Sequence, residues 1–446
     1  MSKPLCLISG PVFNRSGYGD WATAVAKSII RYDKYDVKIA PARWGNCQSK
    51  RFLEELTDPE DRTLASKIIN GALNKQPDVF IQLTIPEEFQ AIGKYNIGMT
   101  AGIETTIPPG SWVEGVNRMN LTIGLSNHVK KTFSEIKMAK QLENGQQVPI
   151  QVEKPIEVCF WGADTNIFKK TDEKIESVES ALSNIKESSA FLFIGQWTHG
   201  GIYNDRKDIG NLIKTFCNAF KNQSQNDRPC LIIKSSGASY STVDRFEIIS
   251  KIKKIRDEVG EKAPNVYLLH GELSEPEMNA LLNHEKVIAH VSFTHGEGYG
   301  HPLLLATLSG KPLLVSNWSG HLDYLNPSYA NLLPGNLVEV DKKSVNQWII
   351  KESKWFKVSY SLAEDKMKQV YFARKSDKFT KNAEYLRKEN SEKFSMTAMD
   401  KKLWSILDQY VPQFAVENQF ILPKLKPIGS NNEIETKLSL PKLKIA

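Results

Sequence analysis

The sequence predicts an α/β protein made of two doubly wound domains that face each other across a cleft. Two observations predict this architecture. Apolar runs of strand length alternate with amphipathic runs of helical spacing, in two successive series along the chain. The chain also has 446 residues, enough for two domains with separate cores. The two series share a design without repeating a sequence.

The first series predicts an N-terminal Rossmann-like domain over residues 1–168. It opens with the apolar strand LCLISG, then a turn, then a helix over 20–32 with apolar residues at helical spacing. The other expected elements are strands at 36–42, 77–85, 95–104 and 119–126 and helices at 62–73 and 126–136.

The second series predicts a C-terminal Rossmann-like domain over residues 169–400. It starts with an acidic connector helix at 171–189. The expected strands are 190–197, 229–236, 265–273, 287–293 and 312–317, and the expected helices are 208–220, 242–260 and 274–285, with further helices from 317 to about 412. Residues 401–446 are expected to be a C-terminal helix that packs back on the first domain, followed by a flexible tail.

Composition excludes several classes of protein. No apolar run approaches the roughly 18 residues of a membrane span, and the N-terminus lacks the pattern of a signal peptide, so we expect a cytoplasmic protein. The five cysteines are scattered without a CxxC pair, which favours buried reduced thiols and gives no metal site. The positive charge is concentrated in 351–402, which holds 14 Lys or Arg and 8 Asp or Glu. This segment is either a solvated helical face or a surface for a polyanion.

The most informative stretch is THGEGYGHPLLLATLSGKP, residues 294–312. Its three glycines allow a sharp turn after a buried strand and a close approach to a ligand, and the helix that follows is almost wholly apolar. The start of such a helix favours phosphate, which a carboxylate repels. Glu297 is therefore expected to face sugar hydroxyls, with a diphosphate beside it.

Two stretches of the first domain are candidates for the opposite wall of the cleft. Gly17 and Gly19, in NRSGYGDW, follow the first strand and would allow a ligand to approach the backbone closely. Glu104, in GIETTIPPGSWVEG, lies between an apolar strand and a proline turn, either at the cleft or in an ordinary loop.

Residues 297–325, EGYGHPLLLATLSGKPLLVSNWSGHLDYL, resemble the donor-site signature of retaining group-1 glycosyltransferases of the GT-B fold. FIGQWTHGGIYNDRKDIGNLIKTF resembles that family's strand, loop and helix element, and WGADTNIF resembles its interdomain linker. The resemblance is strong over about 190–325, weaker over 1–168 and absent after about 340. It implies a GT-B architecture and a UDP-sugar as the expected donor, with no cofactor and no metal.

The resemblance also implies roles for single residues. Arg206 and Lys207 are expected to hold the donor diphosphate, and Glu297 to orient the sugar during a front-face transfer. The remaining donor-binding candidates are Gly17, Gly19, Gly298, Tyr299, Gly300 and His301, and Glu104 is the candidate on the acceptor side. One position departs from the family: its second Glu, which binds the nucleotide ribose, falls on Leu305 here.

The acceptor is open at this stage. The stretches around Gly17 and Glu104 look most like phage-encoded members of the family, some of which glycosylate hydroxymethylcytosine in DNA. Double-stranded DNA could then lie along the basic segment 351–402, and the sugar would be glucose or a pentose such as arabinose. The alternatives are a glycan or lipid-linked acceptor, or a protein that binds a nucleotide sugar without catalysis.

Overall fold

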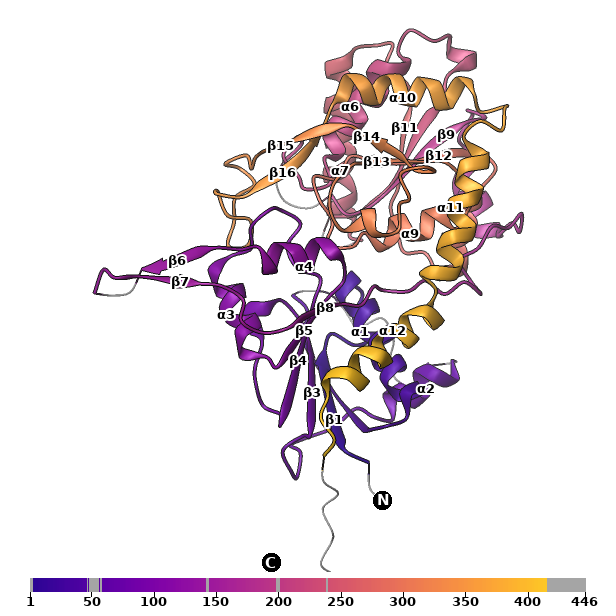
Figure 1. The fold of residues 1–446 in the computed structure, drawn as a ribbon. Coiled ribbons are helices and arrows are strands. Elements are labelled where there is room, and N and C mark those ends of the chain that lie inside the picture. Colours follow the sequence, from indigo (N-terminus) through magenta and orange to yellow (C-terminus); the bar gives the residue numbers. More distant parts are fainter. Residues whose placement is uncertain are drawn as a thin grey trace, which may run out of the picture.

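The computed structural model describes residues 3–45, 47, 56, 58–141, 144–197, 201–237 and 240–414. They form two lobes, each built on a six-stranded parallel sheet with helices on both faces (Figure 1). The predicted fold class, two doubly wound domains, is confirmed.

The sheet of the first domain has the strand order β2-β1-β3-β4-β5-β8. Its strands are β1 (Leu5–Gly10), β2 (Asp36–Pro41), β3 (Val79–Leu83), β4 (Tyr95–Thr100), β5 (Leu121–Gly124) and β8 (Ile156–Val158). Its helices are α1 (Gly17–Tyr32), α2 (Pro59–Ala65), α3 (Gly110–Arg118) and α4 (Asn127–Ser134). The inner strands β1, β3, β4 and β5 are mostly buried on both faces, as expected for parallel strands covered by helices on both sides, whereas the edge strands β2 and β8 are partly exposed.

The sheet of the second domain has the order β11-β10-β9-β12-β13-β14. Its strands are β9 (Ala190–Ile194), β10 (Cys230–Lys234), β11 (Val266–Leu269), β12 (Val287–Ser292), β13 (Leu313–Ser316) and β14 (Asn331–Leu333). Its helices are α5 (Glu176–Leu182), α6 (Ile209–Phe220), α7 (Thr242–Val259), α8 (Glu275–Asn283), α9 (His301–Thr307), α10 (Tyr360–Phe372) and α11 (Thr380–Lys393).

The C-terminal helix α12 (Met396–Tyr410) returns to the first domain and packs against α1 (Figure 1). Arg31 on α1 donates to Asp400 from Nε at 2.9 Å, and Trp404 Nε1 donates to the carbonyl of Ser28 at 3.1 Å. Contacts between a C-terminal helix and the first domain were expected for residues 401–446. The predicted flexible tail lies mostly outside the described residues.

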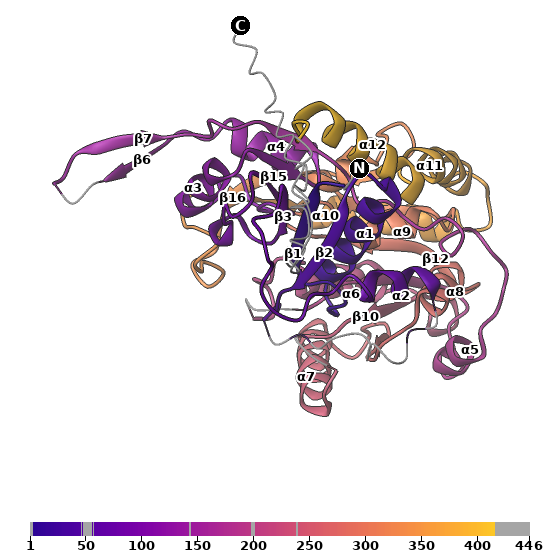
Figure 2. The ribbon, with the colours of Figure 1, turned by 90° about the horizontal axis from the view of Figure 1, so that it is seen from below.

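Several elements differ from the sequence-based expectations. The expected helix at 62–73 is the shorter α2, and the acidic connector is helical only over α5. Two antiparallel hairpins were not predicted: β6 (Met138–Gln141) with β7 (Gln147–Ile150), which projects from the first domain (Figure 2), and β15 (Gly335–Glu339) with β16 (Lys354–Val358). The second hairpin lies where only helices were expected. Its strands are short and carry charges, so no strong period marks them.

The basic segment 351–402 does not form one continuous surface at the cleft. It begins in β16, continues along α10 and α11, and ends in α12. Part of its charge is paired: Arg387–Glu384 and Lys393–Glu389 are ion pairs within α11, and Arg374 pairs with Asp227, which lies before β10. At its start, Lys354 hydrogen-bonds with Thr106, and the Phe356 N–H donates to the carbonyl of His295 in the loop after β12.

Candidate functional site

The loop from 294 to 300 joins β12 to α9 and lies directly against the first domain. A Cβ atom at Gly296 would overlap the carbonyl of Glu104, and one at Gly298 would overlap the carbonyl of Ala101. Ser126 Oγ, at the start of α4, donates to the Gly298 carbonyl at 2.5 Å. The sequence predicted that these glycines let a ligand approach; the structure shows that they let the backbones of the two domains meet.

Glu297 lies in this loop with only 7% of its surface exposed. Its backbone is fixed by the turn before η4 (Gly320–Asp323): its N–H donates to Ser319 Oγ at 2.7 Å, and its carbonyl accepts from the Gly320 N–H at 2.9 Å. Its carboxylate forms ion pairs with Lys207 Nζ and, at 3.4 Å, with an Arg206 guanidinium nitrogen. Burial raises the pKa of Glu297, but these two cations outweigh it and lower the pKa to about 2. The carboxylate is therefore ionised at neutral pH.

Arg206 and Lys207 come from the loop between β9 and α6, next to β12 in the sheet. Arg206 also donates to the carbonyl of Gly296 at 2.9 Å and forms an ion pair with Glu104 of the first domain at 3.1 Å. Burial lowers the pKa of Lys207, an effect that Glu297 opposes. Two cations and two carboxylates from both domains thus form one cluster: Glu104, Arg206, Lys207 and Glu297.

Two buried aspartates hold the loop that carries these cations. The Asp205 carboxylate accepts from the N–H groups of Lys207 at 3.1 Å and Ile209 at 3.2 Å. Asp208 has the left-handed φ of 55° and accepts from Tyr360 Oη at 2.8 Å. Burial, together with Asp208, raises the pKa of Asp205 to about 7. Sequence reasoning missed both aspartates, because DRKD looks like an exposed polar turn until the burial of its acids is known.

The residues after Gly298 contact the protein interior and the interdomain linker. Tyr299 is buried and meets Tyr324 edge-on, and Gly300 has φ 80° at the N-cap of α9. His301 stacks on Trp161 of the linker, with ring centroids 3.6 Å apart and planes 4° from parallel. Burial lowers the pKa of His301 to about 3, so the ring is neutral. In this structure the side chains of Tyr299 and His301 pack against the interior and the linker, and their role in donor binding stays a prediction.

The glycine loop of the first domain lies between β1 and α1. A Cβ atom at Gly19 would overlap the Asn14 carbonyl, so this glycine is needed by the loop itself. Gly17 is exposed, and a Cβ atom there would meet no other atom within 4 Å. Ser16 caps the helix by accepting from the Gly19 N–H at 3.0 Å. Arg15 forms an ion pair with Glu272 of the second domain, which draws this loop towards the end of β11.

Comparison with known proteins identifies the architecture. No protein-family model and no curated protein matches the sequence. Among solved structures, the chain is similar to a glycosyltransferase from Rickettsia africae, with 12% identity, a TM-score of 0.60, and 92% of this chain and 99% of that chain covered. It is also similar to Anabaena HepE in complex with UDP, with 11% identity, a TM-score of 0.55, and 91% and 100% covered. A UDP-forming trehalose-phosphate synthase from Burkholderia xenovorans gives 10% identity, a TM-score of 0.56, and 91% and 100% covered.

The chain has the GT-B fold. In a GT-B protein the carboxyl ends of the two parallel sheets face the cleft, and this is where the charged cluster lies. Within the described residues, no three His, Cys, Asp or Glu side chains gather as metal ligands. No helix in the described part of the chain is long and apolar enough to cross a membrane.

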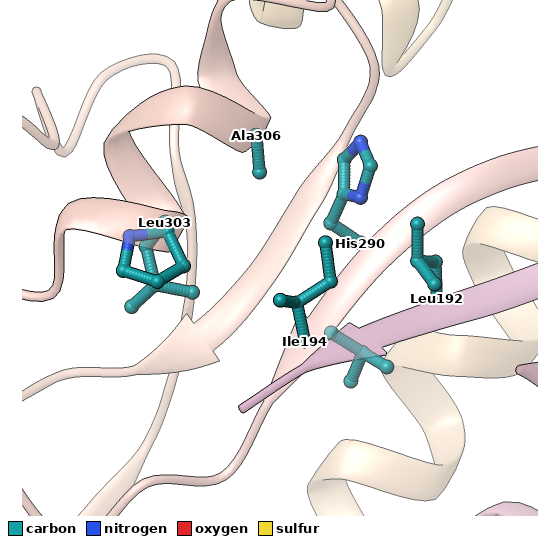
Figure 3. A pocket seen from close by; sticks show the side chains of 7 residues that line it. Leu192, Ile194, His290, Leu303 and Ala306 are labelled. Atoms are coloured by element: carbon teal, nitrogen blue, oxygen red, sulfur yellow. The ribbon is translucent and has the colours of Figure 1, made fainter. Parts of the chain in front are cut away.

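Leu305 of this GT-B chain is half-buried and packs against the main apolar core. Nearby, the inner face of α9 and the strands β9 and β12 enclose a cavity of about 10 Å³, lined by Ile194, His290 and Leu303 among others (Figure 3). This cavity has room for about one water molecule, whereas small-molecule sites are roughly 300–1,000 Å³. By itself this space is therefore too small to be a small-molecule site.

Proposed function

We propose that this protein is a retaining glycosyltransferase that moves a sugar from a UDP-sugar to a hydroxyl acceptor without a metal. The observation that carries the proposal is the buried cluster of Glu297, Lys207, Arg206 and Glu104, which joins the two sheets of a GT-B fold at their carboxyl ends. HepE, a similar structure, was crystallised with UDP and with UDP-glucose, which supports UDP as the nucleotide.

In the proposed reaction Arg206 and Lys207 bind the diphosphate of the donor. The bond between the sugar C1 and the diphosphate oxygen breaks, and the acceptor oxygen bonds to C1 on the same face. The acceptor proton passes to the leaving diphosphate, so the atoms balance without a protein base. The two cations stabilise the negative charge that grows on the diphosphate in the transition state.

The cluster also explains how the carboxylates become available to the substrates. Each cation now contacts a carboxylate, and each can turn to a phosphate oxygen by a side-chain rotation. Glu297 would then be free to accept from sugar hydroxyls and to face the positive charge that develops at the sugar ring. Glu104, on the opposite wall, would be free to contact the acceptor.

For the acceptor, we propose hydroxymethylcytosine in DNA. The support is the likeness of the stretches around Gly17 and Glu104 to phage-encoded enzymes, together with the position of the β15–β16 hairpin. Lys354 of that hairpin exchanges two hydrogen bonds, both 2.9 Å, with Thr106, two residues from Glu104. Lys354 therefore lies beside the acceptor side of the cluster, where a phosphate backbone would pass. A glycan or lipid-linked acceptor is the second candidate, and a non-catalytic binder is the third.

Mass spectrometry tests the proposal directly. The purified protein is incubated with a panel of nucleotide sugars and with hydroxymethylated or unmodified duplex DNA. The expected product is hydroxymethylated DNA heavier by one hexose or pentose, with no product on unmodified DNA. If UDP is released with a glycan acceptor while the mass of the DNA does not change, the acceptor is a glycan and the proposal of a DNA acceptor is wrong. If the protein binds the donor but neither transfers nor hydrolyses the sugar, it is a nucleotide-sugar-binding protein without catalytic activity.

Lys207→Ala is the accompanying variant. Because it removes a charge-assisted contact in a closed site, transfer at low donor concentration should fall by about 30- to 1,000-fold. Lys214→Ala, on the exposed face of α6, is the matched control and should leave transfer unchanged. Equal rates for the Lys207 variant and the wild type would remove Lys207 from the donor site.

A further inference from the structure

Lys234 is a buried cation for which the described residues provide no carboxylate partner. It is the last residue of β10 and is only 6% exposed. Its Nζ donates to the Gly271 carbonyl at 2.7 Å, and within the described residues no other acceptor and no ion pair is found for it. Burial lowers the pKa of Lys234 to about 8, so the side chain still carries its charge at neutral pH. An unpaired buried ammonium is costly to the fold, and its free N–H groups indicate a ligand.

An exposed aromatic ring lies beside this cation. The Lys234 Nζ is 5.2 Å from the centre of the Tyr240 ring, which is 45% exposed. His270, at the end of β11, meets the same ring edge-on at 5.5 Å, and its Nε2 is 2.9 Å from the Asp244 carboxylate. Asp244 also accepts from the Gly237 N–H at 3.0 Å. A donor group thus lies next to a partly exposed aromatic ring.

The order of the strands aligns this group with the charged cluster. β10 is next to β9, and β9 is next to β12, with about 4.8 Å between neighbours. The carboxyl end of β10 is therefore roughly 10 Å from that of β12, with the loop of Arg206 and Lys207 between them. The ion pair of Arg15 with Glu272, one residue after Gly271, brings the first domain to the same place. A nucleotide sugar with its sugar at Glu297 and its diphosphate on the two cations would reach β10 with its base.

We propose that Lys234 and Tyr240 recognise the nucleobase of the donor: Tyr240 stacks on the base, and Lys234 donates to a carbonyl oxygen of uracil. This inference rests on the proposed function, because it requires a nucleotide in the cleft. Adenine has no carbonyl oxygen: its acceptors are ring nitrogens at other positions, and its amino group is a donor that repels an ammonium. A lysine placed to donate to a uracil carbonyl oxygen therefore favours uracil over adenine.

The chain contains a second buried lysine that serves as the control. Lys311 lies just before β13, at the amino end of that strand and away from the carboxyl ends that border the cleft, and burial lowers its pKa to about 7. Its Nζ donates to the carbonyls of His284 and Val287, the latter at 2.7 Å. It therefore joins chain segments away from the cleft, and its replacement should not affect a ligand in the cleft.

Calorimetric titration of the full chain with UDP and with ADP tests the inference. The wild type should bind UDP at least about 10-fold more tightly than ADP, since a hydrogen bond from a charged group is worth about 10- to 100-fold in affinity. Lys234→Met should weaken the binding of UDP by that factor and leave the binding of ADP nearly unchanged. Tyr240→Ala should weaken the binding of both nucleotides, and Lys311→Met should affect the binding of neither.

Each other outcome overturns a defined part. Equal weakening of UDP and ADP by Lys234→Met would place the lysine on the ribose or phosphate, and no weakening would remove it from the site. A wild type that binds no nucleotide would refute the proposed function itself. If Lys234→Met and the milder Lys234→Gln both fail to fold by circular dichroism, the wild-type ratio decides: equal affinity for UDP and ADP refutes selection by Lys234.

Discussion

Two glycine-containing loops border the cleft, and they use glycine differently. In the 294–300 loop, Gly296 and Gly298 lie against carbonyl groups of the opposite domain. In the β1–α1 loop, Gly19 lies against its own loop, and Gly17 faces open space. The sequence predicted ligand approach for both loops. The comparison shows that glycines in a loop indicate that another group comes close to the loop backbone. They do not indicate whether that group is a ligand, the other domain or the loop itself.

The largest expected effect comes from Gly298→Ala. Neither Gly298 nor Gly17 has a positive φ, so alanine is free of backbone strain at both positions, and only the neighbours differ. At Gly298 the new methyl group would push the first domain away from the donor loop. We expect a destabilisation of about 1–3 kcal/mol. Transfer should fall at least about 100-fold, because a shift of about 1 Å in a catalytic group has that effect.

Thermal melting and transfer kinetics check this prediction together. A Gly298→Ala protein with wild-type melting temperature and activity would show that the two domains do not dock as described. A less stable protein with a normal transfer rate would show that the docking of the two domains at Gly298 contributes to stability but not to catalysis.

Glu297→Gln should leave the docking of this loop intact and remove one charge. If the carboxylate faces the positive charge that develops at the sugar ring, turnover falls about 100-fold while donor affinity changes little. Because the pKa of Glu297 is about 2, the acid side of the wild-type pH–rate profile should not reflect this group. Turnover and donor affinity are measured on the same preparation. Full activity in a folded Glu297→Gln protein would show that the carboxylate has no catalytic role and that only the glycines of this loop are needed.

Much of this arrangement could be predicted from the sequence. The alternation of apolar and amphipathic runs gave the two sheets, and loops that follow parallel strands must gather at one edge, which placed Arg206, Lys207 and Glu297 near one another. The partner of Arg206 in the first domain, Glu104, could not be inferred, because its position depends on how the domains dock. The stacking of His301 on Trp161 was hidden for the same reason: the two residues are far apart in the chain.

A smaller effect is expected from Asp205→Asn, which tests how the cations beside the donor loop are held. The pKa of Asp205 is raised to about 7 from an ordinary value of 3.8, so the folded protein binds more protons than the unfolded chain between about pH 4 and 7. Wild-type stability should therefore fall as pH rises through this window, by no more than about 1.4 kcal/mol per pH unit. The variant should lack this slope, as measured by denaturant unfolding at several pH values.

The exposed Asp365→Asn on α10 is the matched control for that experiment and should keep the wild-type slope. Identical slopes for Asp205→Asn and the wild type would mean that Asp205 is ionised in the folded protein. Its two backbone hydrogen bonds would then have to outweigh its burial.

The smallest expected effect is that of Gly17→Ala, and it completes the comparison of the two loops. Gly17 is the first residue of α1 and meets no atom within 4 Å, so a methyl group costs nothing in the protein. Alanine also restricts the unfolded chain more than glycine, which should raise the free energy of unfolding by about 0.4–1 kcal/mol. If the space beside Gly17 is filled by the donor, as the sequence suggested, the same methyl group would raise the KM for the nucleotide sugar while stability still rises. Unchanged KM with higher stability would show that the space beside Gly17 is not filled by the donor, and would leave Gly19 with only its role in holding its own loop.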